Sequence, residues 1–550
     1  MKTASVGLFL VLAGGQASAQ QLSPQQVVRI DSVFAPFDGT SRPGCALGVS
    51  QDGVPTYLRG FGMSDLQSGL AITPQSIFHV ASVSKQFAAM AVALLAQDGK
   101  LSLDDEVRKY LPELPDYGKK ITIRHLIYHT SGIRDHWELL GLAGWRYPTD
   151  LFTQQDVLDI VVRQKALNFN PGDEYVYSNS GYALIAMIVE RVSGKTLRQF
   201  SEERIFKPLG MSNTHVHDDH AMVVPGRTSA YEQVADEWKI SIPNFDTHGA
   251  TSLFTTVGDL LKWQQNFVTG QVGGRQLLDE AETSTVLNNG QPANYGFGIA
   301  IEDFRGTKAF GHGGADAGYR ADVVRFPAQK LAVSVACNFA EATPNVYSRA
   351  VASILIGGQL APIPAPATRA SVSVSASRLG QVAGVYKSPT SDQAYRLAVK
   401  DGKLVLENFD LPLEPIDPNH FAVAGDVAQF DGPADGVPTG MRLVQGRTVI
   451  DSMSRMPVFA PDAASLGDYL GEYWSDELRV SYAVVRNDTI LVLKPFKHPP
   501  APMVPAFQDA FLAGPMGTIR FTRAKGRVTG FLVTRGRVRN VAFTREMTRP

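Results

Sequence analysis

Cysteine, net charge and long apolar runs are all scarce in this chain of 550 residues. Two cysteines are too few for a disulfide-rich scaffold, whose small core needs several bridges. The 52 Lys and Arg residues nearly balance the 53 Asp and Glu residues, and the formal net charge of -1 argues against nucleic acid or an anionic membrane surface as the main partner. Beyond the N-terminus, no apolar run is long enough to cross a bilayer.

Hydrophobic residues, by contrast, make up 44% of the chain, which is enough for packed cores in two or three domains. The N-terminus has the pattern of a secretory signal peptide over residues 1–19. Lys2 supplies the positive charge, residues 6–13 the short apolar segment and Ala17-Ser18-Ala19 the small-residue cleavage site, so the mature chain is predicted to begin at Gln20. These features predict an exported, periplasmic protein without an integral membrane segment after cleavage.

Ser82-Val83-Ser84-Lys85 is the first motif with chemical content. Residues at i and i+3 lie on one face of a helix, so Ser82 and Lys85 are expected to touch. Residues 82–96 are rich in helix formers, and Gly99 follows as a stop signal. The start of a helix favours developing negative charge, and a lysine in an apolar pocket has a lowered pKa. The pair therefore has the chemistry of a nucleophile and its base, although two common residues three apart also recur by chance.

Two further motifs follow in order, Tyr177-Ser178-Asn179 and His312-Gly313-Gly314. With Ser82 and Lys85 they have the composition of a serine acyl-transfer site in which a lysine and a tyrosine move the protons. The surrounding sequence closely resembles the serine β-lactamase and penicillin-binding-protein superfamily, in the branch of class C β-lactamases, related esterases and D-aminopeptidases. The resemblance covers roughly residues 25–357 and rests on segments 77–87, 126–132, 171–182 and 311–320.

The resemblance implies a fold and a role for each residue. The expected fold is an α/β (α+β) catalytic domain of the β-lactamase/transpeptidase type, an antiparallel sheet with helices, over residues 20–360. Ser82 would be the nucleophile, Lys85 its base partner, and Tyr177 the group that relays a proton to the leaving amine or alcohol. A tyrosine, whose ordinary pKa is about 10, acts as a base only where cations stabilise its phenolate, and Lys85 is the natural candidate. Asn179 would donate to a substrate carbonyl and accept from Lys85.

His312 marks a departure from the family pattern. Many members carry Lys-Thr-Gly where this chain has His312-Gly313-Gly314, and a neutral histidine supplies a hydrogen bond rather than a full charge. The chain is therefore more similar to the esterase and D-aminopeptidase members. By analogy, the two glycines let a substrate backbone approach the strand, and the backbone N–H of Ala315 completes the oxyanion hole with that of Ser82.

The two cysteines, Cys45 and Cys337, both lie in strand-like apolar runs. In the family fold the first and last strands of the sheet are neighbours, so a disulfide between them is possible. Two buried free thiols are an interpretation at least as good. The sequence leaves both open.

The chain changes character after the catalytic region. Residues 361–377 are rich in Pro, Ser and Ala and have the composition of an extended linker. Beyond them, short alternating strands replace helical periodicity. Residues 379–386 are echoed by residues 466–473, an offset of 87 that also pairs Tyr395 with Tyr482.

Each copy of this repeat is expected to form a small all-β antiparallel barrel, over residues 378–460 and 461–550, since closing a sheet on itself leaves no open edge. Two barrels after a catalytic domain is the arrangement of the D-aminopeptidase branch, in which a loop of the last domain reaches the substrate cleft. The Pro-rich segment 497–502 is a candidate for that loop, and a plain surface connection is the better-supported interpretation.

Two clusters of charged or imidazole side chains remain. Segment 215–220 holds three histidines and two aspartates in a polar stretch. Because the expected chemistry needs no metal, we expect a solvated loop there and no metal or cofactor. In the C-terminal run that contains Arg535, Arg537 and Arg539, basic and apolar residues alternate. This pattern is typical of the outer face of a barrel strand, so it gives little weight to nucleic-acid binding.

These observations predict an exported serine peptidase or amidase that forms an acyl-enzyme on Ser82 and hydrolyses small or linear peptides. The family implies bonds next to a D-residue such as D-alanine, as in D-aminopeptidases, muropeptide-processing enzymes or linearised-microcystin peptidases. Two alternatives use the same site: an esterase or weak β-lactamase, and a penicillin-binding sensor or peptide-binding protein that acylates without turnover. Steady amine release from a D-alanyl peptide, ester hydrolysis without peptide cleavage, and a stable stoichiometric adduct distinguish the three.

Overall fold

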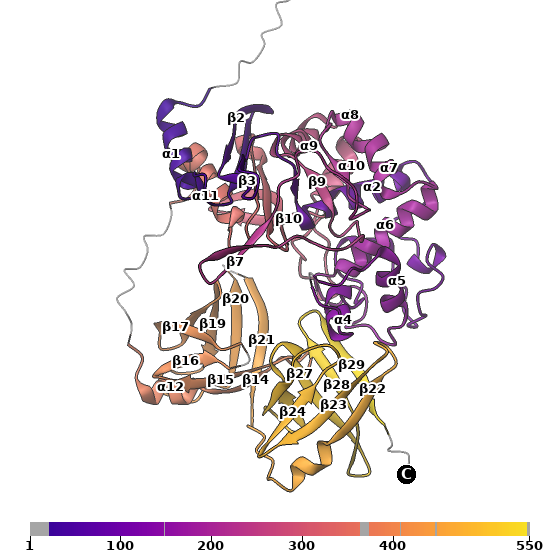
Figure 1. The fold of residues 1–550 in the computed structure, drawn as a ribbon, viewed down its shortest axis with the longest axis vertical. Coiled ribbons are helices and arrows are strands. Elements are labelled where there is room, and N and C mark those ends of the chain that lie inside the picture. The colour runs from indigo at the N-terminus through magenta and orange to yellow at the C-terminus, as the bar shows by residue number, and fades with distance from the viewer. Residues whose placement is uncertain (1–20, 148, 363–372, 408, 446–447, 547–550) are drawn as a thin grey trace, which may run out of the picture.

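A computed structural model describes residues 21–147, 149–362, 373–407, 409–445 and 448–546. The predicted signal peptide and most of the predicted linker lie outside these residues. The described chain forms a body of helices and sheet, drawn at the top of Figure 1, and two barrels below it. Within the described part we find no helix with both the length and the apolar character that a membrane span requires.

The body is built on a six-stranded antiparallel sheet with the order β10-β11-β12-β13-β1-β2, so the first strands of the domain pair with its last. Successive residues of β1 enter two different cores. Leu47 and Val49 pack with the core that holds α1 and α11, whereas Ala46 belongs to the core that holds α9. The sheet is thus covered on both sides. Its strands are β1 (Cys45–Gln51), β2 (Val54–Phe61), β10 (Ala300–Phe304), β11 (Thr307–Asp316), β12 (Tyr319–Phe326) and β13 (Leu331–Cys337), and the helices named are α1 (Pro24–Phe34), α9 (Val257–Thr269) and α11 (Pro344–Ile356).

Cys45 and Cys337 lie opposite each other in the pairing of β1 with β13 and form a disulfide. The sequence left open whether these cysteines form a disulfide or remain free thiols, and the structure contains the disulfide. The bridge joins positions separated by 292 residues and closes the sheet between the start and the end of the domain.

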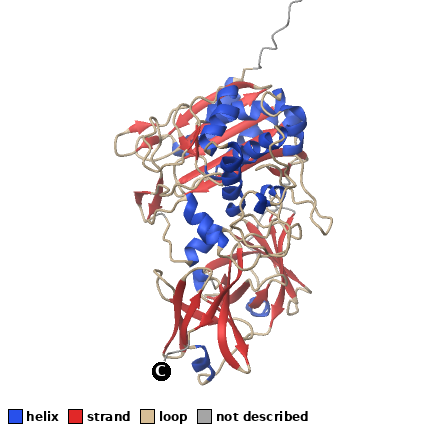
Figure 2. Cartoon of the chain, turned by 90° about the vertical axis from the view of Figure 1, so that its right-hand side faces the viewer, coloured by secondary structure: helices blue, strands red, loops and turns tan. Residues whose placement is uncertain are grey.

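A group of helices lies on the side of the body away from α1 and α11, at the right in Figure 1 (see also Figure 2). At its centre is α2, whose residues from Lys85 to Leu95 are all buried because Ala and other small or apolar residues occur on every face. The predicted helix over 82–96 is confirmed from Lys85 onward, while Ser82 lies in a single 3-10 turn that precedes it. The helices are α2 (Lys85–Gln97), α3 (Ile123–Ile127), α4 (His136–Leu142), α5 (Gln154–Val162), α6 (Asn179–Ser193), α7 (Leu197–Ser201), α8 (Lys207–Leu209) and α10 (Gly274–Ala281).

Three small sheets complete the body. The segment His215–Val216, expected to be part of a solvated loop, is instead strand β6. It pairs with β9 in the three-stranded sheet β5-β9-β6, so backbone hydrogen bonding overrides the polar local sequence. The strands are β3 (Met63–Asp65), β4 (Leu70–Ala71), β5 (Phe78–His79), β7 (Tyr231–Val234), β8 (Glu237–Ile240) and β9 (Leu253–Thr255).

Two closed eight-stranded barrels follow, which confirms the predicted all-β architecture. The sequence repeat is also a repeat of hydrogen bonds. Tyr386 donates to the carbonyl of Val382 at 2.8 Å, and its equivalent Tyr473 donates to Tyr469 at 2.7 Å. The first barrel follows α12 (Ala376–Val382) and contains β14 (Gly384–Lys387), β15 (Ala394–Lys400), β16 (Lys403–Leu406), β17 (Leu411–Asp417), β18 (His420–Val423), β19 (Asp426–Asp431), β20 (Gly440–Gln445) and β21 (Thr448–Met456).

The second barrel is docked against this group of helices, beneath α4 (Figure 1). Arg134 and Glu477 form an ion pair at 2.8 Å with both side chains almost fully buried. Glu477 also accepts from the backbone N–H groups of Lys165 and Ala542, which satisfies both carboxylate oxygens. The strands of the second barrel are β22 (Gly471–Ser475), β23 (Val480–Asn487), β24 (Ile490–Lys494), β25 (Ala501–Pro505), β26 (Ala510–Leu512), β27 (Thr518–Ala524), β28 (Arg527–Arg535) and β29 (Val538–Arg545).

Candidate active site

Ser82 lies in the 3-10 turn Ala81–Ser84, directly before α2. The turn is tight, because Ala81 has φ of 46°, in the left-handed region that L-residues rarely adopt. Strand β11 supports it at Gly314, where a Cβ atom would lie 2.2 Å from the carbonyl oxygen of Val80. Gly314 is therefore needed for the close packing of the strand against this turn.

Lys85 is the first residue of α2 and is fully buried. Its Nζ lies 3.1 Å from Ser82 Oγ, 2.8 Å from Asn179 Oδ1 and 2.6 Å from the carbonyl oxygen of Ala250. The last two groups only accept hydrogen bonds, so they take two N–H donors. A neutral amine has only these two N–H donors. Its lone pair therefore remains to accept the hydroxyl proton of Ser82.

The surroundings of Lys85 favour that neutral form. Burial lowers the pKa of Lys85 well below its ordinary value, and the positive charge of Arg537 lowers it further. Asp135 and Asp316 act in the opposite direction but do not reverse the shift. The amine is thus suited to accept a proton from Ser82.

Tyr177 is half-buried in the segment before α6 and lies close to both Lys85 and Ser82. Its ring packs on His129 at 4.2 Å between centroids, and Lys85 Nζ lies 4.7 Å from the ring centroid. Burial raises the pKa of Tyr177, while a hydrogen bond with Ser82 acts to lower it. With Lys85 favoured as the amine, the resting partner is a phenol rather than the cation-stabilised phenolate we expected from the sequence.

Asn179 is the first residue of α6 and connects Lys85 to a buried carboxylate. Its Oδ1 accepts from Lys85, as expected. Its Nδ2 donates to Asp135 Oδ2 at 2.9 Å, and its backbone N–H donates to the same oxygen at 2.7 Å. Asp135 is fully buried and caps the start of α4. We expected the side-chain amide of Asn179 to donate to a substrate carbonyl. One of its two N–H donors instead binds Asp135 within the protein.

His312 lies on β11 beside Tyr177, with 6.0 Å between ring centroids. Its Nε2 lies 2.9 Å from Tyr295 Oη. Burial lowers the pKa of His312 to about 4, with a further contribution from Lys85, so the ring is neutral near pH 7. Of the four β11 residues singled out in the sequence, Ala315 lines the pocket that contains Ser82, whereas His312, Gly313 and Gly314 are not among the residues that line it.

The pocket has a volume of about 580 Å³ and brings together Ser82, Tyr177 and Asn179. Asp316 also lines it and is held by Tyr147 Oη at 2.6 Å, Thr251 Oγ1 at 2.8 Å and His79 Nε2 at 3.1 Å. Sequence reasoning missed Asp316 and Tyr147, because an acidic residue two positions beyond a glycine pair carries no spacing signal of its own.

Arg537, in the turn between β28 and β29 of the second barrel, also lines this pocket. Its guanidinium lies 3.3 Å from Asp135 Oδ1 and over the ring of Tyr177 at 5.8 Å. The neighbouring arginines also meet the body, Arg535 at Glu138 and Arg539 at Glu174. The sequence suggested the outer face of a barrel strand for these arginines. Arg535 and Arg539 do lie on β28 and β29, whereas Arg537 lies in the turn between these strands, and all three contact the body.

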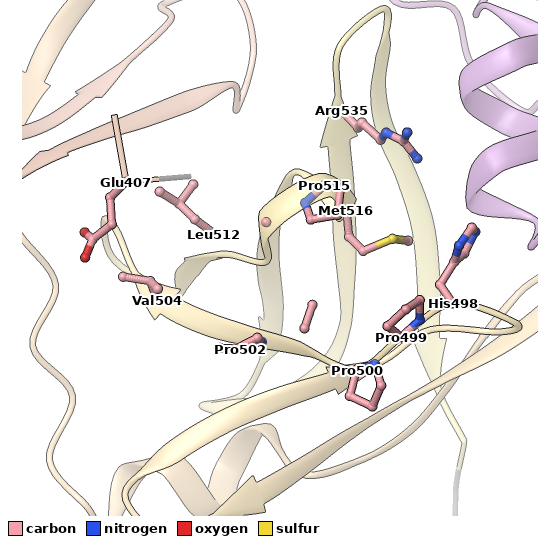
Figure 3. A pocket seen from close by; sticks show the side chains of 12 residues that line it. Glu407, His498, Pro499, Pro500, Pro502, Val504, Leu512, Pro515, Met516 and Arg535 are labelled. Atoms are coloured by element: carbon pink, nitrogen blue, oxygen red, sulfur yellow. The ribbon is translucent and has the colours of Figure 1, made fainter. Parts of the chain in front are cut away.

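The Pro-rich segment 497–502 contacts the body but does not line the pocket of Ser82. His498 Nε2 lies 2.7 Å from the carbonyl oxygen of Gly141. Together with Arg535, it lines a separate pocket between the barrels, where Figure 3 shows these two residues at one end and Glu407 of the first barrel at the other. The hairpin β28–β29, rather than this segment, extends to the candidate active site.

The histidine-rich segment holds one possible cation position. Asp219, His220 and Asp246 place three ligand atoms within 4.8 Å of one another at the surface. Exposed acidic groups often gather in this way without an ion, and this cluster is not part of the pocket of Ser82.

Comparison with known proteins places this chain in a family. The profile of the beta-lactamase family matches residues 30–356, more than half of the chain. The chain belongs to the beta-lactamase family. The family membership supports a serine hydrolase and agrees with the resemblance found in the sequence motifs.

Three relatives illustrate the range of the family. Penicillin-binding protein 4* of Bacillus subtilis (strain 168) is 27% identical over 297 residues, which cover 50% of this chain and 64% of that protein. A D-aminopeptidase of Brucella anthropi is 28% identical over 298 residues, 54% of this chain and 56% of the relative. The chain thus spans less than two thirds of these two proteins. A D-aminopeptidase of Cereibacter sphaeroides is 27% identical over 464 residues, 81% of this chain and 82% of the relative.

Solved structures share the fold. The octameric penicillin-binding protein homologue from Pyrococcus abyssi superimposes with a TM-score of 0.55 at 20% identity, covering 86% of this chain and 97% of that one. The D-amino acid amidase from Ochrobactrum anthropi SV3, in complex with L-phenylalanine amide, gives a TM-score of 0.52 at 22% identity over 61% of this chain and 99% of the other.

Proposed function

We propose that this chain is an exported serine peptidase or amidase that hydrolyses small or linear peptides through an acyl-enzyme on Ser82. The observation that carries the proposal is the set of partners around Lys85 Nζ. Two carbonyl oxygens take its N–H donors, and Ser82 Oγ lies at 3.1 Å in a position to give up its proton. A buried amine in this arrangement is a general base.

The proposed proton path starts from this Lys85–Ser82 contact and adds Tyr177, whose ring centroid lies 4.7 Å from Lys85 Nζ. Ser82 Oγ attacks the substrate carbonyl as its proton passes to Lys85 Nζ, and the backbone N–H groups of Ser82 and Ala315 stabilise the oxyanion. Tyr177 donates its phenolic proton to the leaving nitrogen and is reprotonated by the Lys85 ammonium, which restores the amine. Water then hydrolyses the ester with the roles reversed. The path needs no metal or cofactor.

Substrates next to a D-residue such as D-alanine are the class that the relatives favour. Two of them are named D-aminopeptidases, and one of these matches most of the length of both chains. His312, neutral near pH 7, supplies a hydrogen bond beside Tyr177 instead of the full positive charge of a lysine. The disulfide Cys45–Cys337 supports an exported protein, because such bonds persist mainly in oxidising compartments.

Mass spectrometry of a panel of L- and D-peptides, amides and esters tests this proposal. We expect steady, catalytic release of amine from D-alanyl substrates. Hydrolysis of esters with no amide cleavage would overturn it in favour of an esterase. A single stable acyl adduct per chain without turnover would overturn it in favour of a binding protein or sensor.

A further inference from the structure

An aromatic pocket of about 390 Å³ lies next to the pocket of Ser82. Trp137 and Tyr147 line both pockets, so the two cavities adjoin at these side chains. Their rings lie 5.6 Å apart in an edge-to-face arrangement. Ligand-binding pockets commonly measure about 300–1,000 Å³, so the aromatic pocket has room for a large side chain. The proposed proton path uses none of its residues.

Both shared side chains are held by groups of the candidate active site. Asp135 binds Asn179 through one carboxylate oxygen, and its other oxygen accepts from the backbone N–H of Trp137 at 3.0 Å. The hydroxyl of Tyr147 donates at 2.6 Å to the carboxylate of Asp316 in the neighbouring pocket. The boundary between the two pockets is therefore fixed relative to the catalytic groups.

The apolar part of the lining consists mainly of aromatic rings. Phe152 packs against Trp137 and Trp145, with 4.7 and 6.0 Å between ring centroids and both indoles nearly perpendicular to its own ring. Leu140 of α4 adds an aliphatic side chain. Further aromatic or aliphatic groups pack well on such a surface, because edge-to-face and offset contacts add to the gain from burial.

The charged side chains in the described lining already have partners. Arg146 pairs with Asp150 at 2.7 Å, and Arg535 of the second barrel pairs with Glu138 at 3.0 Å. His498, also from the second barrel, has its Nε2 2.7 Å from a backbone carbonyl oxygen of α4. A charged ligand would have to compete with these contacts, whereas an apolar one covers the rings and leaves the ion pairs intact.

We infer that the aromatic pocket binds a bulky uncharged side chain, aromatic or branched aliphatic, of the peptide that Ser82 cleaves. The inference rests on the proposed function and narrows its substrate class to peptides with such a side chain next to the scissile bond. Burial of this side chain supplies binding energy away from the reacting atoms. Because His498 and Arg535 complete the lining, the second barrel takes part in the selection.

Peptide binding to the Ser82→Ala protein tests the inference without requiring turnover. Isothermal titration calorimetry compares two series of dipeptide amides, D-Ala-X and X-D-Ala, in which X is alanine, leucine, phenylalanine, tryptophan, lysine or glutamate. In at least one series we expect the leucine, phenylalanine and tryptophan peptides to bind about tenfold or more tightly than the alanine peptide, as burial of a large apolar side chain allows. Lysine and glutamate should give no such gain.

Variants locate the side chain in the aromatic pocket. Gly141→Leu fills the pocket from α4, and Trp145→Ala removes one of its rings. A Cβ at Gly141 would have the movable end of the Arg535 side chain as its nearest neighbour, at 3.2 Å, so α4 can hold the new side chain. Each variant should reduce the preference for phenylalanine over alanine about tenfold and keep the affinity for the alanine peptide.

Trp474→Ala is the matched control, because it removes an exposed tryptophan of the second barrel that lines neither pocket. It should bind every peptide as the parent protein does. Circular dichroism checks that each variant is folded, and either pocket variant alone is sufficient. In the wild type, kcat/KM for amine release should follow the same order of side chains as the affinities.

Two results would overturn the inference. The first is equal affinity for the alanine, phenylalanine and lysine peptides, which includes no binding of any of them at about 10 mM. The second is an unchanged preference for phenylalanine in folded Gly141→Leu or Trp145→Ala. Failure of the proposed function has a different signature, since the preference and its loss in the pocket variants would then remain while the wild type cleaves none of the peptides.

Discussion

Arg537→Gln is the most informative single perturbation, because it tests whether the second barrel takes part in the active site. The guanidinium lies 3.3 Å from the fully buried carboxylate of Asp135, which holds Asn179 by two hydrogen bonds. At this distance and an effective dielectric constant of about 20, the gross attraction is about 5 kcal/mol. One third of the Arg537 side chain is exposed. Solvent screening therefore reduces the net coupling to about 1–3 kcal/mol.

The substitution also changes the base. Arg537 is a positive neighbour that lowers the pKa of Lys85, so its removal raises that pKa. The reaction needs Lys85 as the amine, which is lost as the pH falls through its pKa. The acid limb of the kcat/KM profile should therefore move to higher pH in Arg537→Gln. The loss of positioning should lower kcat/KM by about tenfold to a hundredfold at the optimum.

The assay is a pH profile of kcat/KM on a cleaved peptide, together with a double-mutant cycle of Arg537→Gln and Asp135→Asn on the free energy of unfolding. Arg527→Gln is the matched control, because it removes an exposed arginine from the far end of β28, the strand that leads into the turn of Arg537. An unchanged acid limb, with a coupling energy within about 0.5 kcal/mol of zero, would refute the reasoning.

Three further predictions follow from the same structure. Gly314→Ala should lower kcat at least tenfold with the protein still folded, because the new Cβ would lie 2.2 Å from the Val80 carbonyl oxygen and displace the turn that holds Ser82. Steady-state kinetics measure kcat and circular dichroism checks the fold, and a wild-type kcat would contradict the prediction. Replacing Cys45 and Cys337 together by Ser should lower the free energy of unfolding by about 2–5 kcal/mol in denaturant melts, and unchanged stability would show that the bridge does not constrain the unfolded chain. Activity of the wild type should fall as the pH falls through the lowered pKa of Lys85 and persist at neutral pH, so a limb near the ordinary lysine value would show an unperturbed base.

The parts of the fold that the sequence predicted are those that local patterns encode. The apolar helix after Ser82 and the strand repeat with its offset of 87 residues are periodic signals. Both appear in the structure, as α2 and as two closed barrels with equivalent tyrosine hydrogen bonds. The proximity of Ser82 to Lys85 is likewise set by one helical step.

The parts that were missed depend on distant partners. Strand β6 is polar in sequence and exists because β9 offers it backbone hydrogen bonds. Arg537 contacts Asp135 across about 400 residues of chain, and no local spacing reports such a contact. The disulfide required knowledge that β1 and β13 pair in register, which composition alone does not provide.

The central claim is that Ser82, activated by Lys85, carries the reaction. The most direct measurement is the turnover of a D-alanyl peptide by Ser82→Ala, compared with the wild type in the same preparation and with unfolding followed in parallel. The account predicts a loss of at least about a thousandfold in kcat, because the nucleophile and base act as one unit, with a stability change of no more than about 2 kcal/mol. A folded Ser82→Ala protein that retains the wild-type rate would contradict the account.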